Sequence, residues 1–147
     1  MKIAIISSCG GHLTEVRTLA NAYSKYDHFF VINDEIENTT NLKAKVIFIK
    51  HSERDLYFFY NLFEAFIILK REKPDVLLST GAGPIVPFTI IALLFFKIEI
   101  IYIETMASIE KPSLTGRIMY YLVNNFYYQW QSLECYFPKG ICGKPLL

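Results

Sequence analysis

The segment Gly10-Gly11-His12 combines residue types that could bind a phosphate group and move a proton. It follows a short apolar run and precedes a helical pattern that has Thr14 in its first turn. Adjacent glycines at such a turn let backbone N–H groups approach an anion, and the N-terminus of the helix adds about half a positive charge. These residues therefore predict a phosphate site. The alternative is a tight turn that needs glycine only for its backbone dihedral angles.

A second glycine segment, Gly81-Ala82-Gly83, also follows an apolar run and precedes an apolar helical pattern. Pro84 suits the start of that helix, because its missing N–H would have no partner there. In the usual strand order of a doubly wound sheet, the strands that precede the two glycine segments are neighbours. The two segments would then face one crevice, and together they could hold a diphosphate.

Glu104 adds a carboxylate at the end of the apolar run of residues 100–104. If it faces the same crevice as His12, an imidazole and a carboxylate are available for general-base chemistry on a hydroxyl group. Two alternatives remain open at this point. His12 could cap its helix, and Glu104 could accept hydrogen bonds from nearby backbone amides.

The elements that must position these residues follow from the apolar pattern, in which short strand-like runs alternate with longer helical ones. The expected strands are residues 3–8, 29–33, 46–49, 76–79, 100–104 and 126–129. The expected helices are residues 12–25, 54–73, 85–96 and 113–124, the last of them capped by Ser113. At 147 residues the chain is predicted to form one α/β domain, a doubly wound parallel sheet of the Rossmann-like kind.

Charge and cysteine spacing exclude several classes of function. The balance of 15 basic and 14 acidic residues gives a net charge of +1, which is too small for the general attraction on which nucleic-acid binders depend. The three cysteines lack the CxxC spacing of zinc and redox sites, so we expect no disulfide framework and no metal site.

A nicotinamide or flavin cofactor is not expected, although Asp34 and Glu35 lie about where an acidic residue would hold a ribose. A GxGxxG pattern that starts at Gly10 would place His12 and Glu15 at the positions of the second and third glycines. The Glu15 carboxylate would also bring negative charge close to the pyrophosphate. We therefore expect no cofactor.

No membrane-spanning helix or secretion signal is expected. The first apolar run becomes polar at Ser7, too early for a signal peptide. Polar residues, glycines and prolines interrupt the uncharged run of residues 76–96, so its continuous apolar part is far shorter than a membrane span. The predicted location is therefore the cytoplasm.

The helix predicted over residues 54–73 is apolar nearly all round and rich in aromatic side chains such as Phe59 and Phe63. A helix in a small domain buries only one stripe, so its other side must meet lipid or protein. Aromatic side chains with flanking basic residues suit an anionic membrane surface. The basic residues at the ends of this helix include Arg54, Lys70 and Arg71. The alternative is that a partner chain covers the helix.

Five motifs in this order give the chain a resemblance over nearly its whole length. They are CysGlyGlyHisLeuThrGlu, SerThrGlyAlaGlyProIleValPro, TyrIleGluThr, SerLeuThrGlyArg and TyrTyrGlnTrp. Together they resemble the bacterial PssD and CpsF polysaccharide proteins. Those proteins resemble ALG fourteen, the membrane-recruiting subunit of the eukaryotic two-part UDP-N-acetylglucosamine transferase of N-glycan assembly. The glycine segments and Glu104 are also similar to the amino-terminal half of MurG.

This resemblance implies the acceptor-binding half of an inverting GT-B glycosyltransferase of capsular or exopolysaccharide assembly. It implies a lipid-diphosphate sugar acceptor and a separate donor-binding subunit, PssE- or CpsG-like and similar to ALG thirteen, because the chain has no room for a second domain. It carries the family's glycine segments onto Gly10, Gly11, Gly81 and Gly83, with His12 beside them, and its strand-end acid onto Glu104. The implied location is the cytoplasmic face of the plasma membrane. The rival hypothesis is a non-catalytic membrane scaffold that only activates its partner.

Overall fold

A computed structural model describes residues 1–33, 42, 44–50 and 57–146. Its centre is a parallel sheet of seven strands in the order β3-β2-β1-β4-β5-β6-β7, which confirms the predicted doubly wound α/β fold. The strands are β1 (Lys2–Ser7), β2 (Asp27–Asn33), β3 (Lys45–Ile49), β4 (Val76–Ser79), β5 (Glu99–Ile103), β6 (Asn125–Tyr128) and β7 (Ile141–Cys142).

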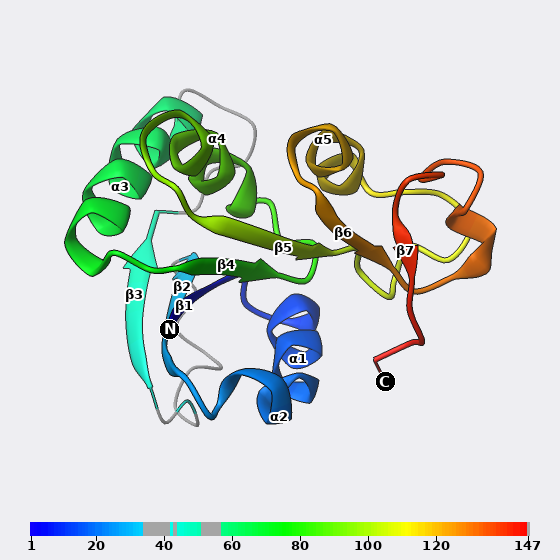
Figure 1. Ribbon diagram of the computed structural model, residues 1–147, viewed down its shortest axis with the longest axis horizontal. Coiled ribbons are helices and arrows are strands. Elements are labelled where there is room, and N and C mark those ends of the chain that lie inside the picture. The colour runs from blue at the N-terminus through cyan, green and yellow to red at the C-terminus, as the bar shows by residue number, and fades with distance from the viewer. Residues whose placement is uncertain (34–41, 43, 51–56, 147) are drawn as a thin grey trace.

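Helices cover the two faces of the sheet unequally (Figure 1). One face carries α1 (Gly11–Thr18) and α2 (Ala20–Tyr23), and the other carries α3 (Tyr57–Glu72), α4 (Ile85–Phe95) and α5 (Leu114–Leu122). Right-handed crossovers explain this division, because the chain reverses direction across the sheet between β3 and β4. A short 3-10 helix, η2 (Gln131–Leu133), lies between β6 and β7.

Buried side chains alternate between the two faces of the central strands. In β1, Ile3 and Ile5 pack on the side of α1, whereas Ala4 and Ile6 pack on the side of α3 and α4. All four are nearly inaccessible to water. Such strands read as continuous apolar runs, which is why their positions could be predicted closely.

Two expectations about the elements are wrong in detail. The helix expected over residues 12–25 is divided at Leu19, whose N–H donates to the Val16 carbonyl three residues back, so the α-helical ladder stops there. The seventh strand, β7, was not expected. It is two exposed residues long and therefore carries no alternating pattern that the sequence could reveal.

Candidate active site at the carboxyl edge of the sheet

The turns that follow β1, β4 and β5 lie at one edge of the sheet. β1 pairs with β4, with Ile5 opposite Leu78, and β4 pairs with β5. The expected neighbourhood of the first and fourth strands is therefore confirmed. It places the two glycine segments and the turn after Glu104 at the edge where doubly wound sheets bind ligands.

His12 joins the first of these turns to the second. Its Nδ1 lies 2.8 Å from the carbonyl oxygen of Thr80, and the hydroxyl of Thr80 donates to the His12 carbonyl at 2.9 Å. Because a carbonyl only accepts, Nδ1 must carry the hydrogen, and Nε2 of the neutral ring keeps its lone pair. Nε2 is thus the nitrogen that can take a proton from a substrate. This bond holds His12 through its ring to the turn after β4, in a way that a simple helix cap would not require.

Gly81 makes room for the imidazole. Its φ angle is +99°, a conformation that disfavours other residues. A Cβ atom on Gly81 would lie 3.1 Å from Cε1 of His12 and 2.9 Å from Cβ of Thr105. The second turn is therefore packed between the first and the third.

The other predicted phosphate residues lie on the open side of these turns. Gly10, Gly11, Thr14 and Gly83 are exposed, and the Thr14 hydroxyl donates to the Gly10 carbonyl at 3.3 Å. Neither α1 nor α4 has a side-chain cap at its N-terminus. Two helix N-termini with positive partial charge therefore lie at this edge, which favours an anion, although the first N–H groups of α4 already donate to the Ala82 and Gly83 carbonyls. Phosphate binding itself stays a prediction.

Glu104 is fully buried and faces α5. Its Oε1 accepts a hydrogen bond from the Ser113 N–H at 2.7 Å, and its Oε2 accepts one from the Tyr102 hydroxyl at 2.9 Å. Burial, and then the Glu104 charge, raise the pKa of Tyr102 well above its usual value, so the phenol remains a donor. Ser113 also caps α5 as predicted, accepting from the Gly116 N–H at 2.9 Å. This geometry favours the structural alternative for Glu104 over a direct role beside His12.

Sequence reasoning missed the residues that hold the third turn in place. The carboxylate of Glu15, buried on α1, accepts from the Thr105 hydroxyl at 2.7 Å and from the Met106 N–H at 3.2 Å. The indole of Trp130 donates to the Met106 carbonyl at 2.7 Å, and the Gln129 side chain donates to the Glu104 carbonyl at 2.9 Å. The HisLeuThrGlu and TyrTyrGlnTrp motifs contain three of these residues, but nothing in their spacing reveals the contacts.

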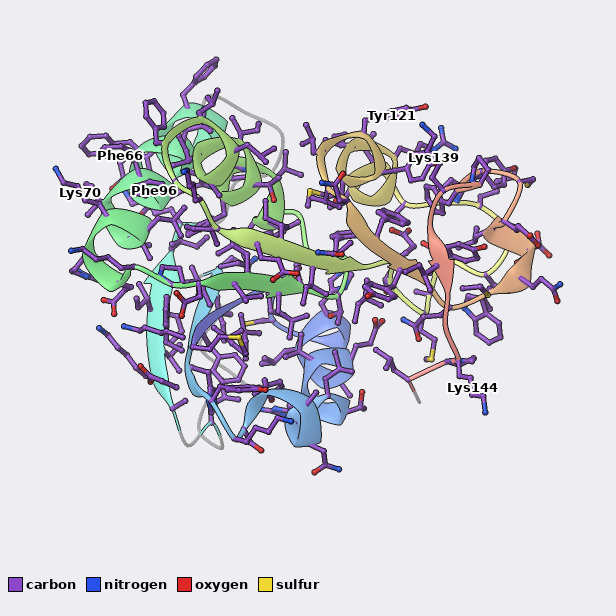
Figure 2. All side chains as sticks on the ribbon, viewed as in Figure 1. Phe66, Lys70, Phe96, Tyr121, Lys139 and Lys144 are labelled. Carbon is purple, nitrogen blue, oxygen red and sulfur yellow. The ribbon has the colours of Figure 1, made fainter. Side chains whose placement is uncertain are left out.

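Four of the five predicted membrane residues, Phe59, Phe63, Lys70 and Arg71, lie on α3. Phe59 and Phe63 are 69% and 63% exposed. Lys70 lies over the Phe66 ring, 5.8 Å from its centroid, and Phe66 contacts Phe96 beyond the end of α4 (Figure 2). Arg71 is exposed but donates to Glu72. Arg54 lies outside the described residues. No helix within the described ranges is both long and apolar enough to cross a bilayer.

Comparison with known proteins identifies the family. The family model described as "Oligosaccharide biosynthesis protein Alg14 like" matches residues 55–142, more than half of the chain. The chain belongs to the Alg14-like family. This Alg14-like chain is a homologue of the UDP-N-acetylglucosamine transferase subunit ALG14: it is 28% identical to the mouse protein over 96% of its own length and 81% of that of the relative. The protein from Saccharomyces cerevisiae is 49% identical over 29% of the chain and 18% of its own length.

Solved structures share the fold of the Alg14-like chain. MurG of Acinetobacter baumannii matches with a TM-score of 0.71 at 14% identity, over 87% of this chain and 40% of its own. UDP-GlcNAc 2-epimerase from Methanocaldococcus jannaschii matches with a TM-score of 0.72 at 16% identity, over 97% and 45% of the two chains. The chain thus spans less than half of each. The expected likeness of fold to half of MurG is confirmed.

Proposed function

We propose that this Alg14-like chain is the acceptor-binding subunit of a two-component inverting UDP-sugar glycosyltransferase. Its motifs, which resemble those of the bacterial PssD and CpsF proteins, support a role in capsular or exopolysaccharide assembly. The observation that carries the proposal is the position of His12, whose Nε2 is the free acceptor nitrogen at the sheet edge where the N-termini of α1 and α4 lie. Its mouse and human relatives are named as transferase subunits, which agrees with this proposal.

In the proposed reaction, backbone amides of the two glycine segments hold the diphosphate of a lipid-linked sugar acceptor. Nε2 of His12 takes the proton from the acceptor hydroxyl as that oxygen attacks the anomeric carbon of the donor sugar. The bond from that carbon to UDP breaks from the opposite side, and UDP leaves with the bonding electron pair. One direct displacement inverts the anomeric centre. Glu104 contributes by fixing the turn after β5 to α5.

The donor sugar nucleotide is assigned to a second subunit, PssE- or CpsG-like and similar to ALG thirteen. An apolar groove of about 340 Å³ on the α1 side of the sheet offers it a surface, because Ile101 and Ile103 of β5 are only partly buried there. The groove is lined by Ile3, Ala22, Tyr26, Leu78, Ile101 and Ile103, among others. An amphipathic helix of the partner would bury these side chains.

The groove can be tested without disturbing the core. Ala22 is exposed on α2 and lines the groove, whereas the adjacent, equally exposed Asn21 does not. Ala22→Glu should weaken co-purification with the donor-binding subunit at least ten-fold, while Asn21→Glu should leave it unchanged. Equal binding by both variants would move the interface elsewhere, with the exposed face of α3 as the next surface to test.

The catalytic assignment is tested in the reconstituted pair, with UDP-sugars and a lipid-diphosphate sugar acceptor. His12→Ala should lower turnover about 100- to 10,000-fold, the usual contribution of a general base, without loosening the two subunits. His28→Ala is a matched control, because His28 also bonds a backbone carbonyl through Nδ1, at 2.8 Å, but does so at the start of β2. Full activity of His12→Ala would end the proposal that this chain supplies the base.

The rival proposal is a non-catalytic membrane scaffold. Exposed apolar side chains on α3 and α4 favour a recruiting surface in either case. The two proposals differ in what the donor-binding subunit does alone with a soluble acceptor analogue. Transfer at the rate of the complex would support the scaffold, and transfer that needs this chain would support the shared active site.

A further inference from the structure

Glu15 holds a buried carboxylate that the reaction proposed above does not use. It lies on α1, one turn beyond His12, and its side chain is almost inaccessible to water. Its Oε1 accepts from the Thr105 hydroxyl at 2.7 Å and from the Met106 N–H at 3.2 Å, and its Oε2 lies 3.3 Å from the same N–H. Each of these donors belongs to the turn after β5.

These donors are neutral, and the ion pairs found within the described residues do not include Glu15. A buried carboxylate loses its hydration, and hydrogen bonds from neutral donors replace only part of it. A pair of apolar residues could link the two elements at lower cost. The Glu15 carboxylate is therefore unlike the carboxylates that form structural ion pairs elsewhere in the described residues.

Thr105 connects this carboxylate to His12. A Cβ atom on Gly81 would lie 2.9 Å from the Cβ of Thr105 and 3.1 Å from the Cε1 of His12, so both side chains border the space beside Gly81. Thr105 thus lies near the imidazole, and its hydroxyl is fixed by Glu15. Nδ1, the ring atom bonded to Cε1, is held on the Thr80 carbonyl. Movement of Thr105 would give the ring space to leave that carbonyl.

We infer that Glu15 is a positioning residue for His12. Through Thr105 it holds the imidazole against the turn after β4, keeps the hydrogen on Nδ1 and leaves Nε2 directed to the acceptor hydroxyl. This inference rests on the proposed function for its catalytic consequence. The positioning itself is a property of the chain alone.

Two pairs of variants test the link. Glu15→Gln keeps the shape of the side chain but removes the charge and puts an amide donor where an oxygen accepts. Thr105→Val keeps Cβ and a methyl group but loses the hydroxyl, whereas Thr105→Ser keeps the hydroxyl and should behave as wild type. Glu72→Gln is the matched control, because it removes a buried carboxylate at the amino edge of the sheet.

The first readout needs no activity. Long-range 1H–15N NMR spectra of the isolated chain report which ring nitrogen of His12 carries the hydrogen. The spectra are recorded with the imidazole neutral, and the His12 signals are assigned by their loss in His12→Gln. Wild type, Thr105→Ser and Glu72→Gln should show the Nδ1–H form alone, whereas Glu15→Gln and Thr105→Val should show a mixture. An unchanged tautomer in both of the latter variants would overturn the inference.

The second readout is turnover of the assembled pair. Glu15→Gln and Thr105→Val should lower kcat about ten- to a hundred-fold, as small misplacements of a reacting group do, with the KM for the UDP-sugar unchanged. If Glu15→Gln and Thr105→Val lose activity only in proportion to their loss of thermal stability, as we expect for Glu72→Gln, the result would contradict a positioning role for Glu15. If wild type transfers no sugar, the proposed function fails, but the tautomers still decide the role of Glu15.

Discussion

At the scale of single residues, the site depends on glycines that admit side chains from other elements. Gly116, in the first turn of α5, lies so close to the Glu104 carboxyl group that a Cβ atom there would overlap it. The same carboxyl accepts the Ser113 N–H. The absence of one methyl group at Gly116 therefore allows α5 to be fixed to the end of β5.

Gly116→Ala should therefore destabilise the domain by about 1–3 kcal/mol, the usual range for an overpacked core, although alanine favours helices. Thermal or denaturant unfolding monitored by circular dichroism measures this change. Gly143→Ala is the control, because a Cβ there would meet its nearest atom, the Tyr128 carbonyl oxygen, at an ordinary 3.7 Å. Equal stability of the two variants would show that α5 can shift to admit the methyl group.

The place of His12 and the glycine segments in one site could be predicted from their residue types and from their positions directly after strands. The turns that follow parallel strands lie at one edge of a sheet. The partners of the carboxylates could not be predicted in this way. Glu104 and Glu15 are both held by residues of other elements, and Glu15 meets Thr105 at a separation of 90 positions in the chain. We used the Glu15 charge as an argument against a dinucleotide site, but the sequence did not show that this carboxylate accepts hydrogen bonds from the turn after β5.

At the scale of elements, the buried strands could be predicted to within a few residues, while short exposed elements could not. β1 and β4 are apolar on both faces and stand out from their flanks. The break at Leu19 depends on a change in backbone geometry that the apolar spacing of residues 12–25 does not record. β7 forms only because η2 returns the chain beside β6.

The amino edge of the sheet is held by an ion cluster around Glu72, at the end of α3. Its carboxylate contacts Lys45 at 2.7 Å, Arg71 at 2.8 Å and Lys2 at 3.1 Å, and so joins α3 to the starts of β1 and β3. Hydrogen bonds, first from Lys45, lower the pKa of Glu72 to about 2 from an ordinary value of 4.5. The unfolded chain therefore binds this proton more readily than the folded one.

The stability from this cluster is present above pH 4.5 and should be lost as the pH falls toward 2, because protonation of Glu72 then favours the unfolded state. Urea unfolding at steps of pH should show a smaller loss of stability over this window in Glu72→Gln than in wild type. Glu110→Gln, which removes an exposed carboxylate, should retain the wild-type slope. Identical slopes in all three proteins would mean that the cluster contributes nothing in solution.

At the scale of the whole molecule, apolar side chains face outward on each of the three helices on one side of the sheet. They are Phe59, Phe63 and Ile67 on α3, Leu93, Leu94 and Phe95 on α4, and Leu114, Ile118 and Tyr121 on α5. Figure 2 shows Tyr121 projecting from α5 on the same side of the sheet as Phe66 and Lys70. A helix at a water-exposed surface normally carries polar residues there, so this layer supports the prediction that the chain contacts a membrane surface.

Membrane binding should therefore depend on apolar burial more than on charge. Phe59→Ser with Phe63→Ser should strongly reduce co-sedimentation with anionic vesicles, because burial of each phenylalanine contributes about 1.5–3 kcal/mol. High salt should release the wild-type protein only in part, since salt screens the charge of exposed basic side chains such as Lys70 but leaves the burial of apolar side chains intact. Phe48→Ser with Tyr136→Ser, which removes two aromatic side chains exposed on other elements, should bind as wild type does. If the α3 variant binds vesicles normally but no longer associates with the donor-binding subunit, this helix face is a protein interface.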